Sequence, residues 1–425
     1  MKTVLRIAAR IAMSSPIGPV AFAQQAVPVR TLTKPALSDS GLFMTLSNLR
    51  PLSDGRVIVD DLFRRRILLF DSTLATWRIL ADTAQGAPTR YPNTYAAIVP
   101  YVGDSTFLVN SEAQTLEVID PSGAFVRTMA IPRPADLRFL QIAPGSAATD
   151  PRGRLVYRVS RGRAAPRSPA ASDSGAVTIT VIRDSAAIVR ADFDTRLVDT
   201  IATHAVPVQK SLTMATGNGG YAGTVAYNPL PQTDDWAMLP DGTIAIVRGQ
   251  DYHIDWVRPD GTRSSSPKMP FDWKRITIED KQRMLDSARQ AAADRDARAA
   301  EARAAAAAGG SVGGRGAPPG GRGFVAPRFP FTTVDVTDMP DYYPPIRSGT
   351  VRSDPEGNVW ILPTTSVLSD GGLIYDVVNR KGVVIERVKL PARRNLLAIG
   401  ARGVVYMSYT PKGGLIQLER AQVIR

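Results

Sequence analysis

Short runs of β-branched and aromatic residues, each bounded by polar or turn residues, recur along most of the chain. In the clearest group, a turn at Asp54-Gly55 precedes apolar runs within 56–60, 66–71 and 76–80, and the apolar run 42–46 comes shortly before the turn. Runs this short, and this rich in Val and Ile, favour strands over helices. The pattern predicts a four-stranded unit in which 42–46 forms the first strand.

A turn followed by such runs occurs five more times. The turn glycines of the units are Gly55, Gly103, Gly153, Gly242, Gly357 and Gly403. Three of the intervals between them are close to the roughly 40–50 residues of a propeller blade, and the intervals after Gly153 and Gly242 are longer. We therefore expect an all-β chain folded as a six-bladed β-propeller with four-stranded blades. The last unit is one strand short, so we expect residues 27–33 to pair with it and close the ring.

The excess length falls in three excursions, at about 160–185, 204–233 and 270–346. In the largest, Thr277 fits a helix N-cap with acidic residues behind it, and alanine-rich sequence then runs to Gly309. This pattern predicts a helix over about 277–308, inserted into the propeller. Residues 309–328 are rich in Gly, Pro and Arg, a composition that predicts a flexible linker.

The repeat resembles that of a known class of propellers. The stretch 54–60 together with 66–71 resembles the repeat of NHL-type and TolB-like six-bladed β-propellers, and 236–256 resembles a segment of bacterial exported propellers of that group. The resemblance covers about 28–425 apart from the insertions. It implies a fold and says little about function, because one such scaffold supports many activities.

The resemblance also implies where each part of a blade lies. The first strand of each blade lines a central channel, the short turns share one face, and the three long excursions share the other. Loops on a rigid scaffold usually carry function, so we expect the loop-rich face to be the working one.

The first 23 residues have the pattern of a secretory signal peptide. Lys2, Arg6 and Arg10 give a positive start, 11–20 is moderately apolar, and Ala21-Phe22-Ala23 fits a cleavage site. No later stretch reaches the ~18 apolar residues of a membrane helix. We expect a mature chain of 24–425, exported to the periplasm or secreted, and soluble.

Composition narrows the chemistry. The chain has no cysteine and only two histidines, which excludes disulfides, Cys-ligated zinc, iron–sulfur clusters and thiol nucleophiles. Its formal charge is +13, from 52 basic and 39 acidic residues. A chain this basic could attract polyanions, but the basic residues are dispersed apart from 64–66 and 393–394. A solvated basic surface is favoured, and a nucleic-acid partner is not expected.

A few polar residues near strand ends remain as candidates for a site at the channel mouth. No catalytic residue can be assigned. Oxygen donors suit a hard divalent cation such as calcium, which six-bladed lactonase-like enzymes bind at this place, although no ligand pattern of those enzymes is reproduced and no cofactor is evident. His253 alternates with Asp255 along a strand, which could orient the imidazole, but a hydrogen-bonded core histidine is the favoured interpretation. The candidates are Asp60, Asp61, Asn110, Arg248, Asp251 and His253. The carboxylates among them are expected to be exposed loop groups.

Two functions follow from these observations. The leading hypothesis is an exported binding module that presents its loop-rich face to a protein or glycan partner. The alternative is a metal-assisted hydrolase or lyase, lactonase-like, that acts at the channel mouth. The scarcity of histidine favours the first.

Overall fold

The computed structural model describes residues 27–38, 43, 46, 48–87, 89–92, 96–140, 147–159, 177–182, 185–215, 221–308, 331–367, 371–411 and 415–425. The expected signal peptide at 1–23 and the expected linker at 309–328 lie outside these residues.

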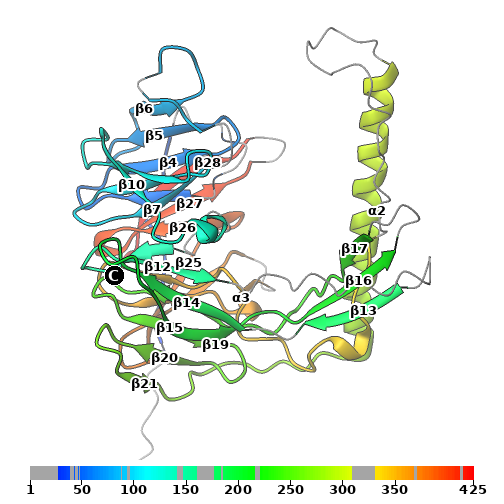
Figure 1. Ribbon diagram of the computed structural model, residues 1–425. Coiled ribbons are helices and arrows are strands. Elements are labelled where there is room, and N and C mark those ends of the chain that lie inside the picture. The colour runs from blue at the N-terminus through cyan, green and yellow to red at the C-terminus, as the bar shows by residue number, and fades with distance from the viewer. Residues whose placement is uncertain are drawn as a thin grey trace, which may run out of the picture.

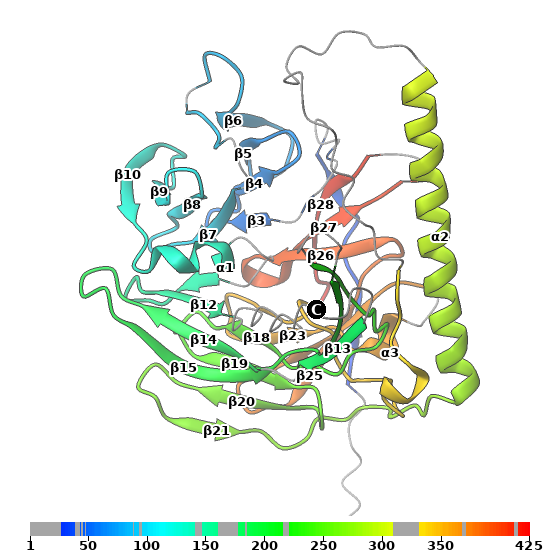
Figure 2. The same ribbon diagram turned by 45° about the vertical axis from the view of Figure 1, so that its right-hand side comes forward.

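Six of the seven sheets in the described residues follow one plan: apart from two added N-terminal strands, the strands are antiparallel neighbours in chain order, starting from a common centre (Figures 1 and 2). The first three of these sheets are β3 (Asn48–Pro51), β4 (Val57–Asp61), β5 (Arg66–Phe70) and β6 (Trp77–Asp82); β7 (Ala97–Pro100), β8 (Thr106–Asn110), β9 (Thr115–Ile119) and β10 (Phe125–Ala130); and β11 (Ala147–Thr149), β12 (Leu155–Val159), β14 (Ser185–Ala191) and β15 (Val198–Ala205).

The other three sheets include the two short N-terminal strands. They are β18 (Asp235–Met238), β19 (Ile244–Arg248), β20 (His253–Val257) and β21 (Arg263–Ser265); β22 (Arg352–Ser353), β23 (Val359–Ile361), β24 (Ile374–Val378) and β25 (Val384–Lys389) with β1 (Val29–Arg30); and β26 (Arg394–Ile399), β27 (Val404–Tyr409) and β28 (Gln417–Gln422) with β2 (Ala36–Leu37).

These six sheets form a circuit around one cavity. Their first strands, β3, β7, β11, β18, β22 and β26, all contribute to the lining of the same cavity. Six clusters of buried apolar side chains fill the spaces between successive sheets, including the space between the last sheet and the first. Four-stranded antiparallel sheets arranged radially about a centre are the architecture of a β-propeller.

The N-terminal segment joins the end of the chain to its beginning. Strand β2 pairs with β28 of the last sheet, and Leu32 and Phe43 form bridges to Val423 and Ile416. Strand β1 instead pairs in parallel with β25 of the preceding sheet. The predicted pairing of the N-terminal segment with the last unit is confirmed, but at residues 32–43 and not across the whole of 27–33.

The expected first strand of the first sheet was wrong. The strand that pairs with β4 is β3, at 48–51, and not 42–46. The tight turn between them is closed by hydrogen bonds from Leu52 N–H to the carbonyl oxygen of Arg56 and from Gly55 N–H to the carbonyl oxygen of Leu52. It sets Pro51 opposite Val57, so the paired strand must end directly before the turn. Of the residues in the apolar run, Phe43 and Leu46 are described, and both are buried between the first and last sheets.

The three excursions pack against one another outside the six sheets. β13 (Val177–Ile182), β16 (Gln209–Ala215) and β17 (Tyr221–Val225) form a separate three-stranded sheet. The long helix α2 (Ile278–Ala308) stands beside the six sheets (Figure 1). It shares a small core with the excursion residues Leu212, Ala226, Val334 and Met339, to which α2 contributes Leu285.

The predicted helix is confirmed. Its N-cap is Thr277, whose hydroxyl accepts the backbone N–H of Asp280 at 3.1 Å. The remaining helical segments among the described residues are short: α1 (Leu137–Leu140), α3 (Thr364–Val367) and the 3-10 turns Pro134–Asp136, Val336–Asp338 and Ala401–Gly403. None of the helices in the described part of the chain is long and apolar enough to cross a membrane.

Candidate functional site: the central cavity

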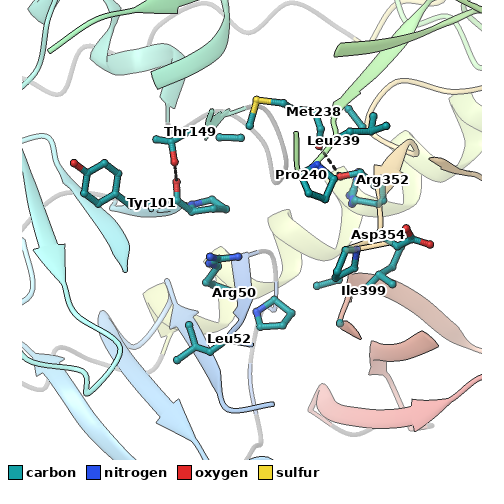
Figure 3. A pocket seen from close by; sticks show the side chains of 18 of the residues that line it. Arg50, Leu52, Tyr101, Thr149, Met238, Leu239, Pro240, Arg352, Asp354 and Ile399 are labelled. Atoms are coloured by element: carbon teal, nitrogen blue, oxygen red, sulfur yellow. Dashed lines mark hydrogen bonds between the residues drawn. The ribbon is translucent and has the colours of Figure 1, made fainter. Parts of the chain in front are cut away.

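A cavity of about 610 Å³ lies at the centre of the six sheets (Figure 3). Its lining runs along the first strand of each sheet and continues into the short turn that follows. The volume falls in the range of roughly 300–1,000 Å³ that is usual for small-molecule sites. We expected the working surface at the loop-rich face, whereas this cavity is built from the first strands and the short turns.

Strand register places one residue of each sheet at the same level of the cavity wall. In five sheets the first strand ends opposite the residue that begins the second strand, and in the last sheet Ile399 ends β26 opposite Val405, the second residue of β27. At the level one residue before that end, the six positions are Arg50, Val99, Ala148, Ala237, Arg352 and Ala398. Five of these residues line the cavity, three alanines and two arginines, whereas Val99 is buried between its sheet and the next.

Arg50 is only partly neutralised. Its Nη2 lies 3.8 Å from Oδ1 of Asp104, while the other oxygen of Asp104 accepts the backbone N–H of Ser53 at 2.9 Å. Its Nε is buried and has no hydrogen-bond partner among the described residues. Burial lowers the pKa of Arg50, and the nearby Asp104 carboxylate opposes this effect. The guanidinium thus retains unused donor capacity at the cavity wall.

Arg352 is held by backbone groups. Its Nη1 donates to the carbonyl oxygens of Gly349 at 2.9 Å and Val351 at 2.8 Å. Among the described residues, no carboxylate oxygen lies within 4.0 Å of it. The charge of this guanidinium is therefore not cancelled by a direct ion pair.

Two acidic residues of the lining are engaged within their own turns. Asp150 is paired with Arg154 at 2.6 Å. Asp354 accepts hydrogen bonds from the side chains of Asn358 at 2.9 Å and Trp360 at 3.0 Å. Asp150 is thus neutralised by Arg154, whereas Asp354 keeps its negative charge because its partners are neutral.

The rest of the lining is largely apolar. It includes aliphatic side chains and five prolines, each at the end of a first strand or two residues beyond it: Pro51, Pro100, Pro151, Pro240, Pro355, Leu52, Met238, Leu239 and Ile399. The proline at 51 is tolerated because β3 is the innermost strand of its sheet and has no partner on the cavity side. Such a wall can contact an apolar molecule while the guanidinium groups supply hydrogen-bond donors.

Asp60 and Asp61 are not exposed loop groups, and that expectation was wrong. Both end strand β4 and are fully buried, because strand β4 lies inside its sheet. Oδ1 of Asp60 accepts the hydroxyl of Tyr91 at 3.0 Å, and its Oδ2 has no partner among the described residues. Burial raises the pKa of Asp60 to about 7. Asp61 is paired with Nε of Arg66 at 2.9 Å.

Asn110 has a structural role in a turn. Its Nδ2 donates to Oε1 of Glu117 at 2.7 Å, and its Oδ1 accepts the backbone N–H groups of Glu112 and Ala113 at 3.1 and 3.0 Å. Its polar groups are thus used to shape the turn between β8 and β9.

The three remaining candidates, Arg248, Asp251 and His253, lie together in one network. His253 places Nδ1 2.6 Å from Asp251 and Nε2 3.2 Å from Asp255. Arg248 donates to Asp255 and to Asp234, each at 2.7 Å. The hydrogen bonding expected of His253 is confirmed, with both ring nitrogens facing carboxylates, but the residue is half-buried and not in the core as expected. The network does not contribute to the lining of the central cavity.

The described residues contain no group of three or more His, Asp or Glu side chains placed to hold a metal ion. We therefore derive no step through a metal at the cavity.

Sequence reasoning did not single out Arg50 and Arg352. Each precedes the turn glycine of its unit, Gly55 or Gly357, by five residues. Alignment of the units on these glycines would have shown two arginines where three other units have alanine and one has isoleucine.

Comparison with known proteins identifies no family. No protein-family model matches the chain, and no curated protein matches it. Among solved structures, virginiamycin B lyase from Staphylococcus aureus is 9% identical over 92% of this chain and 99% of its own, with a TM-score of 0.38. Regucalcin from Agrobacterium tumefaciens, described as a calcium-binding protein, is 11% identical over 93% of this chain and 96% of its own, with a TM-score of 0.37. The PQQ-bound aldose sugar dehydrogenase from Streptomyces coelicolor is 12% identical over 92% of this chain and 97% of its own, with a TM-score of 0.39. All three are propeller-type proteins, and at these TM-scores the likeness carries no argument about what this chain binds or does.

Proposed function

We propose that this protein is an exported six-bladed β-propeller that binds a small ligand in its central cavity. The observation that carries the proposal is the cavity itself: about 610 Å³, walled by the first strands of six sheets, and mostly apolar with a few convergent polar groups. Cavities with this combination of volume and lining are the usual sites of small ligands. The blade number agrees with six inner strands and six inter-sheet clusters in the described residues.

Small side chains keep the cavity open. Ala148, Ala237 and Ala398 lie at one level of its wall, where larger residues would fill the space. A phenylalanine at Ala148, which is only partly buried, should narrow the cavity without disturbing the closely packed interior of a sheet.

The proposal can be tested with a neutral apolar dye, N-phenyl-1-naphthylamine, whose fluorescence rises in an apolar site. We expect saturable binding to the wild-type protein and at least about tenfold weaker binding to Ala148→Phe, since lost contacts of about 1.4 kcal/mol correspond to that factor. Ala113→Phe is the matched control, because Ala113 is exposed in the turn between β8 and β9. Equal binding to wild type and Ala148→Phe, at equal melting temperature, would overturn the proposal.

A second candidate function is recognition of a protein or glycan by the loop-rich face. Three aromatic side chains there are substantially exposed: Tyr227, Trp273 and Tyr342. The chain beside Trp273 runs next to Tyr342, since Arg275 forms a bridge to Tyr342. Exposed aromatic residues are enriched at recognition surfaces. Glycan-array binding that is lost in Trp273→Ala and retained in Trp77→Ala, a partly exposed tryptophan on β6, would support this function.

The alternative of a metal-assisted hydrolase or lyase would use the same cavity. It lacks a recognisable donor set among the described residues. Elemental analysis of the purified protein tests it, because one stoichiometric calcium, zinc or magnesium ion would favour that reaction class.

A further inference from the structure

We propose that the central cavity selects organic anions: molecules that carry a carboxylate, phosphate or sulfonate group on an apolar body, with the anionic group bound by Arg50 and Arg352. This inference rests on the proposed function of ligand binding and specifies the chemical class of the ligand.

The first argument is the placement of the two arginines. They occupy equivalent register positions on β3 and β22, and the sheet between these two contributes Ala398 at the same level. Figure 3 shows Arg50 and Arg352 on different sides of the open space. With a small residue between them, a single ligand can reach either guanidinium without a bulky side chain in the way.

The second argument is the balance of charge. Asp104 lies 3.8 Å from Arg50 and its other oxygen accepts the N–H of Ser53. Asp150 forms an ion pair with Arg154. Asp354 accepts hydrogen bonds from the side chains of Asn358 and Trp360. Asp354 keeps its negative charge because its hydrogen-bond partners are neutral, so the positive potential is confined to the surroundings of the two guanidinium groups, where low-dielectric walls strengthen it.

The third argument is the unused hydrogen-bonding capacity. The buried Nε of Arg50 has no partner among the described residues, although buried polar groups are normally satisfied. On Arg352, the hydrogen bonds found among the described residues come from Nη1. A guanidinium presents its donors in a planar fork that matches the oxygens of carboxylate and phosphate groups. An oxyanion in the cavity would satisfy these donors.

The fourth argument is the apolar wall. Prolines and aliphatic side chains such as Leu52, Met238 and Ile399 surround the space beside the arginines. A fully hydrated inorganic anion would leave this surface in contact with water, whereas an organic anion would cover it. The lining therefore favours an oxyanion attached to an apolar body.

A matched pair of dyes separates the anionic from the apolar contribution. The compound 8-anilinonaphthalene-1-sulfonate is N-phenyl-1-naphthylamine with one added sulfonate, so the ratio of their affinities reports the contribution of the negative charge. We expect the wild-type protein to bind the sulfonate at least about tenfold more tightly, since a hydrogen bond to a charged group contributes about 1.5–3 kcal/mol.

Substitution of the arginines then tests whether they cause the higher affinity for the sulfonate. Arg50→Gln and Arg352→Gln should each weaken sulfonate binding about tenfold, change binding of the neutral dye less than about twofold, and leave the melting temperature nearly unchanged. Arg50→Lys should retain part of the preference because it keeps the charge. Arg298→Gln, on the exposed surface of α2, is the control for loss of one positive charge and should leave both affinities unchanged.

The outcomes distinguish the two proposals. Suppose that the neutral dye binds and that Ala148→Phe blocks its binding. If the sulfonate then binds no more tightly than the neutral dye, or if its tighter binding persists in both arginine variants, the anion preference is overturned and the ligand site stands. If neither dye binds the wild-type protein, or if Ala148→Phe changes neither affinity, the proposed function fails and this inference fails with it.

Discussion

The hydroxyl of Tyr91 donates a hydrogen bond of 3.0 Å to Oδ1 of Asp60, and both side chains are completely buried. Burial raises the pKa of both groups, so the pair resists ionisation in the folded protein. The neighbouring carboxylate of Asp61 adds to this effect on Asp60. Asp60 was expected to act at an exposed site, whereas it is a buried carboxyl whose protonation state is coupled to folding.

The first prediction concerns the pH dependence that Asp60 adds to stability. Its pKa is about 7 in the folded protein and about 3.8 in an unfolded chain, so between these values only the folded state holds the proton. The contribution of Asp60 therefore makes the free energy of unfolding fall as the pH rises from about 4 to 7, by at most about 4 kcal/mol. Asp60→Asn keeps an acceptor for Tyr91 and should remove this slope.

Chemical denaturation of wild type and Asp60→Asn at several pH values from 4.5 to 8 measures the effect. The difference in stability should favour the variant increasingly up to about pH 7 and then level off. A difference that is constant across this range would contradict the assignment.

The second prediction concerns His204, whose contribution to the free energy of unfolding changes with pH in the opposite direction to that of Asp60. This residue lies on β15, where its side chain is only 1% exposed and its Nε2 has no partner among the described residues. Burial lowers its pKa to about 4, with the nearby charge of Arg158 adding to the effect. The unfolded chain therefore binds more protons between about pH 4 and 6.5, and the contribution of His204 makes stability fall as the pH falls through this range.

Replacement of His204 by Gln should remove the loss of stability that this residue contributes between pH 6.5 and 4.5, so the variant should gain stability relative to wild type as the pH falls. The measurement is the same set of denaturation curves, and the comparison with Asp60→Asn isolates the two opposing slopes. If the difference in stability between His204→Gln and wild type stays constant from pH 6.5 to 4.5, the histidine is not the group responsible.

The third prediction concerns closure of the ring. Phe43 is fully buried between the first and last sheets and pairs with Ile416. Phe43→Ala should lower the free energy of unfolding by about 3–5 kcal/mol, the usual cost of removing a buried phenylalanine side chain. Val29→Ala is the control in the same N-terminal segment, because Val29 is 54% exposed and should change stability by less than about 0.5 kcal/mol. Equal melting temperatures for the two variants would argue against closure through Phe43.

The fourth prediction concerns helix α2. Beyond Leu285, only Ala292 among the described side chains of the helix is buried, so tertiary packing adds little to the stability of its C-terminal part. Limited trypsin digestion should therefore cut first at Arg289, Arg295, Arg298 or Arg303, before any cut in the six sheets. Mass mapping identifies the sites, and early cleavage at Arg64 or Arg66 with α2 intact would contradict the prediction.

The second and third strands of the sheets could be predicted from the sequence, whereas the first strands β3 and β22 could not. Runs such as Val57–Asp61 and Arg66–Phe70 are apolar because they are buried on both faces between neighbouring sheets. The glycine turns were equally informative: Gly55 has a φ of 88°, a backbone conformation that favours glycine. Helix α2 was predictable because its cap and its alanine-rich composition are local features.

The first strands β3 and β22 have a different sequence pattern. β3 reads Asn-Leu-Arg-Pro and β22 has only two residues, so neither shows an apolar run. They are polar and short because their inner edge faces a cavity and not another strand. β3 and β22, which the sequence pattern does not reveal, are therefore the strands that carry the two arginines of the candidate site. The burial of Asp60 was hidden for another reason, since its partner Tyr91 lies 31 residues away along the chain.

The pairing of the N-terminal segment with β25 and β28 has a consequence for the biogenesis of the protein. These two strands belong to the last sheets to be synthesised, and β1 and β2 to the first few residues of the described chain. A nascent chain therefore holds its N-terminal segment without its native partners until β25 and β28 have been synthesised. The N-terminal segment can join the ring only then, and a chain truncated shortly before β28 has the sequence of almost every sheet but lacks the strand with which β2 pairs.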